Sequence, residues 1–178
     1  MFKRFKNKWK DQKGFGSIEI VISSMIVVMM VAGLIDMIQI TQRLDTTSQA
    51  TGYVSRIVQK QGGVTVSRIP NYNGKYTSSK VLYNNVKDMM AANGVSEDNW
   101  DLTLTLKNGV QYTLSPTTSV PIVDYGERIR ITLSVNYHWD TLASMFPGDL
   151  SGNRESTKEV LSGYQIRDTD KMETELDI

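Results

Sequence analysis

The sequence lacks several residues and motifs that carry chemistry in proteins. It contains no cysteine, which excludes a disulfide framework, a thiol nucleophile and every zinc site built on cysteine. His138 is the single histidine, so a zinc site would depend on carboxylates and one imidazole, an unusual ligand set. Phosphate-binding loops, dinucleotide fingerprints, calcium loops and G-x-S-x-G elbows are also missing. We therefore expect no cofactor, no metal and no enzymatic activity.

Charge is distributed unevenly along the 178 residues. The net charge of the chain is +1, but residues 1–14 hold six basic residues against Asp11, so residues 15–178 have a net charge of −4. A nucleic-acid-binding protein is expected to carry a basic face on its folded part. Because the excess here is confined to a short arm, we expect no direct nucleic-acid binding by the folded domain. The basic residues of the arm are Lys3, Arg4, Lys6, Lys8, Lys10 and Lys13.

An apolar run follows the basic arm. Residues 20–35 contain no charge, and the wider stretch 15–40 is interrupted only by Glu19, Asp36 and Gln39. As helices, the two stretches would be about 24 Å and about 39 Å long, on either side of the roughly 30 Å hydrocarbon core of a bilayer. Because lysine and arginine concentrate on the cytoplasmic side, the pattern predicts one membrane-spanning helix with a cytoplasmic N terminus and an extracytoplasmic C terminus.

A cleaved secretory signal is an alternative for the same segment. The small residues of Val31-Ala32-Gly33 suit such a cleavage site, which would release a soluble domain beginning near Leu34. A buried helix of a soluble protein fits less well, since it explains neither the basic arm nor the all-round apolar surface.

Glu19 lies near the cytoplasmic edge of the apolar run, directly after Lys13-Gly14-Phe15-Gly16-Ser17-Ile18. An ionisable residue within a membrane segment is costly unless it is paired, which makes Glu19 a functional candidate. As an alternative, its carboxylate extends into the headgroup layer and has no further role.

This segment resembles the processing site of type IV pilins, and is most similar to TadE-like pseudopilins and related single-pass proteins of secretion or conjugation loci. The resemblance implies that a prepilin-type peptidase cuts between Gly14 and Phe15, so that Glu19 becomes the fifth residue of the mature chain. It also implies assembly with other pilin-like subunits through the N-terminal helix. Two departures are Gly16, after which a cut would put Glu19 third, and the absence of the paired cysteines found in many pilins.

Charge pairing gives the implied spacing a physical reason. A cut after Gly14 would create an amine at Phe15 in a medium of low dielectric constant. A carboxylate one helical turn away, on the same or a neighbouring subunit, would neutralise that amine. Glu19 would then help to set the stagger between packed helices.

Beyond the apolar run the pattern predicts two helices. The first continues to about Gln61, where Gly62-Gly63 ends it. A loop over residues 68–77 leads to a second helix, which is capped by Thr77, Ser78 or Ser79 and ends at Gly94. The apolar face of this second helix is Val81, Leu82, Val86, Met89 and Met90.

Strands follow the helices. Residues 100–106 and 110–114 alternate around Asn108-Gly109, which predicts a hairpin. Residues 128–139 form a long alternating strand, with Tyr137 and Trp139 at the end of its apolar face, and residues 155–166 form a weaker one after a loop over residues 145–153. Residues 165–178, with a net charge of −3, are expected to be a solvated tail.

The predicted fold is therefore α+β, with a long N-terminal helix, a second helix and a three- to four-stranded antiparallel meander. The predicted segments are a basic cytoplasmic leader (1–14), a transmembrane helix (15–40), an extracytoplasmic α+β domain (41–164) and an acidic tail (165–178). The leading functional hypothesis is a pilin-like subunit in the cell membrane, in contact with membrane lipid. The alternative is an unprocessed, membrane-anchored binding domain that contacts its partners through the sheet.

Overall fold

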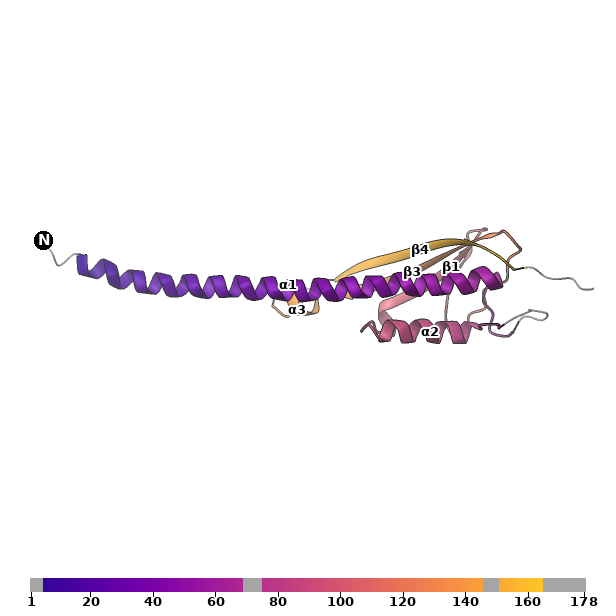
Figure 1. Ribbon diagram of the computed structural model, residues 1–178, viewed down its shortest axis with the longest axis horizontal. Coiled ribbons are helices and arrows are strands. Elements are labelled where there is room, and N and C mark those ends of the chain that lie inside the picture. The colour runs from indigo at the N-terminus through magenta and orange to yellow at the C-terminus, as the bar shows by residue number, and fades with distance from the viewer. Residues whose placement is uncertain (1–4, 69–74, 146–150, 165–178) are drawn as a thin grey trace, which may run out of the picture. The chain divides into compact units, whose positions relative to one another are not determined.

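The computed structural model describes residues 5–68, 75–145 and 151–164, with side chains from Gly16 onward. The chain divides into two compact units, of which the first joins Met1–Thr41 to His138–Ser151 and the second joins Gln42–Tyr137 to Gly152–Ile178. The elements are α1 (Phe5–Gln61), α2 (Ser79–Ala91), the 3-10 turn η1 (Glu97–Asn99), β1 (Trp100–Leu106), β2 (Gln111–Thr113), β3 (Arg128–His138), α3 (Asp140–Ala143) and β4 (Ser151–Leu161), as labelled in Figure 1.

The predicted α+β class is confirmed, and so is the end of the first helix at Gln61. Gly62 follows with a φ of 71°, a left-handed conformation that glycine adopts at no steric cost. A Cβ at Gly62 would also lie only 2.7 Å from the Cβ of Tyr164 and 2.9 Å from the carbonyl oxygen of Val123. The glycine therefore both ends α1 and allows two distant segments to pass close to its backbone.

The second unit contains a four-stranded sheet in the order β2-β1-β3-β4. β1 pairs antiparallel with β2 and with β3, in a register that places Leu104 opposite both Tyr112 and Ile131. The predicted meander is therefore wrong, because β1 lies between β2 and β3. The connector between β2 and β3 passes by Val64, where Val120 forms an isolated antiparallel bridge. No local sequence pattern predicts this bridge.

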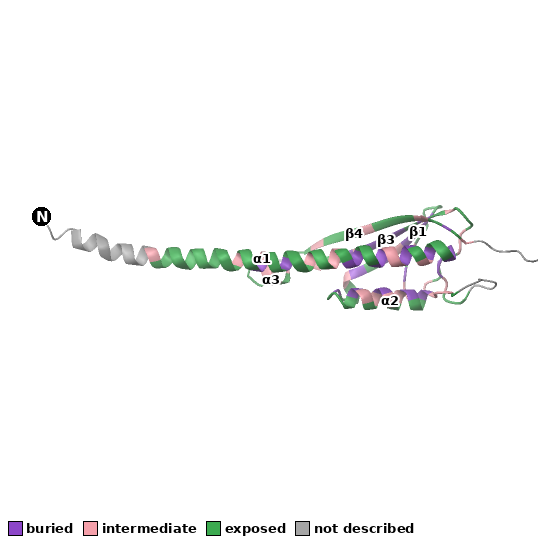
Figure 2. Ribbon diagram, viewed as in Figure 1, coloured by how far each residue is buried: buried purple, intermediate pink, exposed green. Residues whose placement is uncertain are grey.

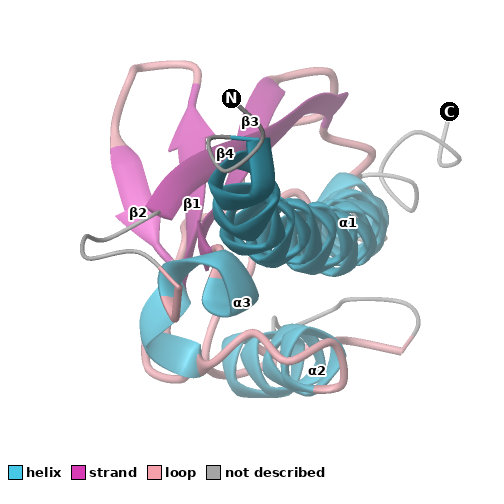
Figure 3. Cartoon of the chain, turned by 90° about the vertical axis from the view of Figure 1, so that its left-hand side faces the viewer, coloured by secondary structure: helices cyan, strands magenta, loops and turns pink. Residues whose placement is uncertain are grey.

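Alternating burial along β1 and β3 shows that one face of the sheet is covered. The second half of α1 and α2 lie against this face, as Figure 3 shows. The buried apolar core consists of Ala50, Val54, Val58, Val64, Leu82, Val86, Met90, Val95, Trp100, Leu102, Leu104, Leu106, Leu114, Val120, Ile129, Ile131, Leu133 and Val135. Val81, expected on the apolar face of α2, is 49% exposed, because the buried stripe runs through Leu82, Val86 and Met90.

The hairpin is confirmed, with Gly109 at a φ of 79° and its N–H donated to the carbonyl oxygen of Leu106. The end of the chain differs more from the prediction. β4 begins at Ser151 rather than Glu155 and ends at Leu161, and most of its side chains are exposed while none is buried, so its pattern gave only a weak signal. The helix α3 was not predicted. Residues 69–74 of the predicted loop, 146–150 and the tail from residue 165 lie outside the described residues.

Candidate functional site

The predicted processing site lies in the first part of α1. Gly14 and Phe15 both belong to this helix, which begins at Phe5 and continues through them without a break. Lys6, Lys8, Lys10 and Lys13 belong to its first turns, whereas Lys3 and Arg4 lie outside the described residues. Gly16 has no neighbouring atom within 4 Å of the position of an added Cβ. The predicted scissile bond is therefore helical in this structure.

Glu19 is exposed, and so are nearly all of the apolar residues that follow it as far as Ile38. In Figure 2 most of the described part of this half of α1 is green, the colour of exposed residues. Consecutive residues are exposed in this part of α1, so the apolar surface extends around the whole circumference of the helix. By length and composition, α1 can therefore cross a membrane. The large exposed apolar residues are Ile18, Ile20, Val21, Ile22, Met25, Ile26, Val27, Val28, Met30, Val31, Leu34, Ile35, Met37 and Ile38.

Asp36 has a role that the sequence did not reveal. Its side chain is only 1% exposed, although it follows directly after the uncharged run. Oδ1 accepts a hydrogen bond from the backbone N–H of Thr141 at 3.0 Å, and Oδ2 accepts one from that of Leu142 at 2.8 Å. These N–H groups belong to the first turn of α3, where no preceding carbonyl of the helix can reach them. The carboxylate therefore caps α3 from more than a hundred residues away.

Small residues bring α3 close to α1 beside this carboxylate (Figure 1). Ala32 is 3% exposed, and a Cβ at Gly33 would lie 3.6 Å from Cδ1 of Leu142. The sequence pattern indicated that both residues could belong to a signal-cleavage site. In the structure they form, together with Asp36, the surface of α1 on which Thr141 and Leu142 pack.

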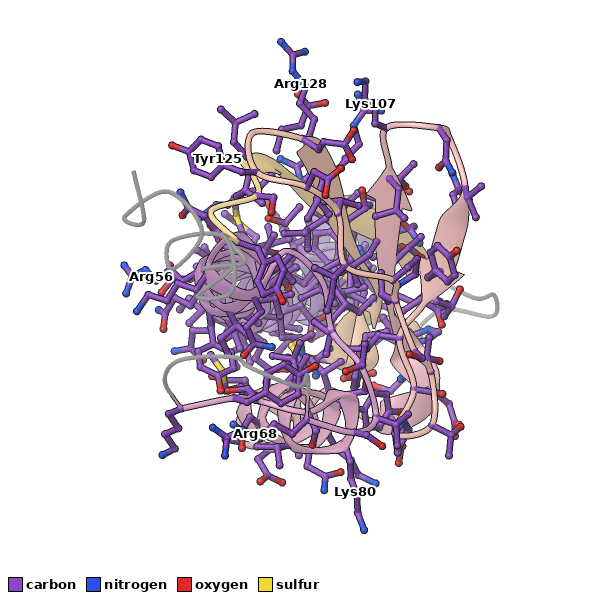
Figure 4. The ribbon with its side chains drawn as sticks, turned by 90° about the vertical axis from the view of Figure 1, so that its right-hand side faces the viewer. Arg56, Arg68, Lys80, Lys107, Tyr125 and Arg128 are labelled. Carbon is purple, nitrogen blue, oxygen red and sulfur yellow. The ribbon has the colours of Figure 1, made fainter. Side chains whose placement is uncertain are left out.

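The second unit has an open cleft of about 770 Å³ at one end of the sheet. Within it, Arg130 donates to Oε1 of Glu159 from Nε at 2.9 Å and from Nη2 at 2.6 Å. The Arg130 guanidinium and, more weakly, the charge of Arg128 hold the pKa of the Glu159 carboxyl below its usual range. Figure 4 shows Lys107 and Arg128 extending away from the body of the unit. The cleft lining is Thr105, Leu106, Lys107, Gly109, Tyr125, Gly126, Glu127, Arg128, Arg130 and Glu159.

His138 ends β3 and is partly exposed, next to Trp139. Among the described residues, no group of three or more histidine, aspartate or glutamate side chains is arranged to hold a metal ion.

Two surfaces of the described chain thus stand out, the exposed apolar helix with its acidic residues and the charged cleft of the second unit. Comparison with known proteins gives no match to a family model, to a curated protein or to a solved structure.

Proposed function

We propose that this chain is a pilin-like or pseudopilin assembly subunit of a bacterial envelope filament, secretion or conjugation machine, processed after Gly14. The observation that carries the proposal is the position of Gly14, Phe15 and Glu19 at the junction of a basic arm and a helix whose apolar residues face outward on all sides. Such a surface requires an apolar environment, which lipid supplies before assembly and neighbouring helices supply afterwards.

Glu19 supplies the electrostatic part of the proposal. Its carboxylate lies one helical turn after Phe15 and is exposed, so it is accessible to a neighbouring chain. Cleavage gives Phe15 a positively charged amine. In a medium of low dielectric constant, an amine and a carboxylate that meet stabilise each other far more than they would in water. Pairing between subunits would therefore favour one axial offset between helices over others.

Access to the scissile bond requires a local change in α1. A protease binds its substrate in an extended form, whereas residues 14 and 15 are helical here. Two glycines in three residues, Gly14 and Gly16, each weaken a helix by about 1 kcal/mol relative to alanine. We infer that this pair allows the first turns of α1 to unwind in the peptidase.

Co-expression of the full chain with a prepilin-type peptidase tests the processing. We expect the intact mass to fall by that of residues 1–14, and Gly14→Ala to abolish this loss. Gly16→Ala is the matched comparison: it causes no clash and removes only one of the two helix-weakening glycines, so it should slow the cut but leave its position unchanged. An unchanged intact mass of the native sequence would contradict the proposal.

Glu19→Ala tests the assembly step separately. We expect this variant to insert into membranes normally but to lose contacts between subunits. The absence of native cysteine allows a single cysteine introduced on α1 to report those contacts by crosslinking. Equal crosslinking of the variant and the parent would assign Glu19 to the headgroup layer alone.

An unprocessed, membrane-anchored binding domain is the second candidate, favoured by the cleft of the second unit. Its open lining combines Arg128 and the exposed ring of Tyr125 with two ion pairs, Lys107–Glu127 and Arg130–Glu159, which suits a polar ligand. This candidate predicts that the protein purified from native membranes keeps its lysine-rich arm. The N-terminal sequence of that protein distinguishes the two functions.

A further inference from the structure

The position of Asp36 along α1 matches the thickness of a bilayer. Residues 16–35 would extend about 30 Å as a helix, which is the thickness of a typical hydrocarbon core. Glu19 is the only charged residue within them, near the cytoplasmic end. Asp36 follows at the other end, where the chain would leave the hydrocarbon on the outer side.

A carboxylate at this depth needs partners, because transfer of an unpaired charge out of water is unfavourable. The backbone N–H groups of Thr141 and Leu142 serve as these partners, and the packing of α3 removes Asp36 from the surroundings almost completely. In return, the carboxylate provides the first turn of α3 with acceptors that a four-residue helix cannot supply itself. The Asp36 carboxylate and the first turn of α3 therefore stabilise each other, and they hold α3 beside residue 36 of α1.

The segment around α3 has the composition of a membrane–water interface. Trp139 and Leu142 are partly exposed and Met145 is 41% exposed, whereas Asp140 and Ser144 are exposed polar residues. Tryptophan concentrates at the headgroup level because its ring is apolar and its N–H requires a polar partner. A segment that was fully surrounded by hydrocarbon would not carry the exposed carboxylate of Asp140.

We infer that residues 138–145 form a collar that lies in the outer headgroup layer and is fastened to α1 by Asp36. The partner of the collar is the lipid surface itself, and its effect is to fix how far α1 sinks into the membrane. The inference rests on the proposed membrane anchoring of α1. It goes beyond that proposal by assigning a lipid-binding role to a segment more than a hundred residues away in sequence.

Depth-dependent quenching of tryptophan fluorescence tests the collar in the full chain. The protein is reconstituted in phosphatidylcholine–phosphatidylglycerol vesicles that contain lipids brominated either near the headgroup or near the chain end. Comparison of Trp9→Phe with Trp9→Phe/Trp139→Phe isolates the Trp139 signal and leaves the buried Trp100 in place. We expect Trp139 to be quenched strongly by bromine near the headgroup and weakly by bromine near the chain end.

A second tryptophan reporter tests the membrane anchoring of α1 independently of the collar. Met25→Trp in the Trp9→Phe/Trp139→Phe background places a tryptophan in the middle of the apolar run, where bromine near the chain end should quench it. Quenching of this reporter without any quenching of Trp139 would overturn the collar and leave the anchoring intact. No quenching of either residue would overturn both.

Substitution of Asp36 tests how the collar is fastened. We expect Asp36→Leu to lose most of the Trp139 quenching by headgroup bromine, and Asp36→Asn, which keeps one acceptor, to lose part of it. Asp45→Asn is the matched control, because Asp45 is an exposed acid of α1 in the second unit. Unchanged quenching in Asp36→Leu, with the Met25→Trp reporter still quenched, would overturn the role of Asp36.

Discussion

Gln61, the last residue of α1, has a polar side chain that is buried. It is 2% exposed, and its amide pairs with the backbone of a single residue. Oε1 accepts the N–H of Thr77 at 2.8 Å, and Nε2 donates to the carbonyl oxygen of Thr77 at 3.0 Å. The Gln61 amide thus makes the two hydrogen bonds to Thr77 that a neighbouring strand would otherwise make. It connects the end of α1 to the segment that leads into α2.

Replacing Gln61 with leucine should destabilise the protein. Leucine is apolar and similar in size, but it leaves the N–H and C=O of Thr77 without their partners, at a cost of about 2 kcal/mol in the free energy of unfolding. Urea denaturation in detergent measures this change. Gln59→Leu is the control, because that side chain is exposed. Equal stability of the two variants would mean that solvent replaces the lost hydrogen bonds of Thr77.

Gly62 and Asp36 show which features of a residue the sequence predicts and which it does not. The glycines after Gln61 were recognisable as a helix end, because left-handed glycine is a local property. The close approach of Val123 and Tyr164 to Gly62 was not recognisable, since it depends on segments at least sixty residues away. Asp36 is a similar case. Its charge was visible as an interruption of the apolar run, but its partners at Thr141 and Leu142 were not.

A polar clamp joins α2 to the turn η1 that precedes the sheet. The hydroxyl of Tyr83 donates to Oε1 of Glu97 at 2.6 Å, and Lys87 forms an ion pair with the same carboxylate. Burial, and then the hydrogen bond to Glu97, raise the pKa of Tyr83 to about 12. The Tyr83 ring also packs on Trp100, with ring centroids 5.3 Å apart. The clamp thus fixes the entry to β1 against α2.

Alkaline pH should weaken this clamp. Because the folded state raises the pKa of Tyr83 above 10.0, the fold favours the protonated phenol. Its contribution to stability is present below pH 10.0 and is lost as the pH rises through about 12. We therefore expect the stability advantage of the parent over Tyr83→Phe to shrink across this interval. Urea denaturation of the parent and of Tyr83→Phe at successive pH values measures the difference between their free energies of unfolding.

Absorbance of tyrosinate provides a second measurement of the same clamp. Tyr83→Phe should remove one ionisation with a midpoint of about 12. Tyr125→Phe, which removes an exposed tyrosine far from Glu97 in the sequence, controls for the loss of one of the eight tyrosines. Loss of the same high-pH ionisation in both variants would contradict the assignment to Tyr83.

The elements that the sequence predicted well are those with strong periodicity. The second half of α1, α2, β1 and β3 each bury one face, so burial leaves a pattern in the sequence. β4 does not, because it lies at the edge of the sheet with most side chains exposed. α3 has four residues and depends on Asp36 for its capping, so no local signal marked it. Strand order likewise depends on pairing between segments distant in the sequence, such as that of β1 with β3.

At the scale of the whole molecule, the two units differ in how they are stabilised. The apolar core cluster lies entirely within the second unit, between Ala50 and Val135. The exposed apolar side chains of α1, from Ile18 to Ile38, lie entirely within the first. Burial of apolar surface therefore stabilises the second unit in water, whereas the first unit presents apolar surface that water does not solvate favourably.

A chain that begins at Gln42 tests this division. We expect residues 42–178 to be soluble without detergent and to unfold cooperatively, because they keep the whole core cluster. They lose Ala32, Gly33 and Asp36, however, so Thr141 and Leu142 lose the contacts that hold residues 138–145 to α1. Limited proteolysis should then cut first within that segment, and much faster than in the full chain in detergent.

Asp36→Asn in the full chain is the intermediate case, because one of the two acceptors of the carboxylate remains on the side chain. Its rate of cleavage within residues 138–145 should lie between those of the parent and the shortened chain. Aggregation of residues 42–178, or unfolding without a cooperative transition, would mean that the core needs the first half of α1 to form. Since the core residues already exclude water without that half, we expect the shortened chain to keep its sheet and to lose order only around α3.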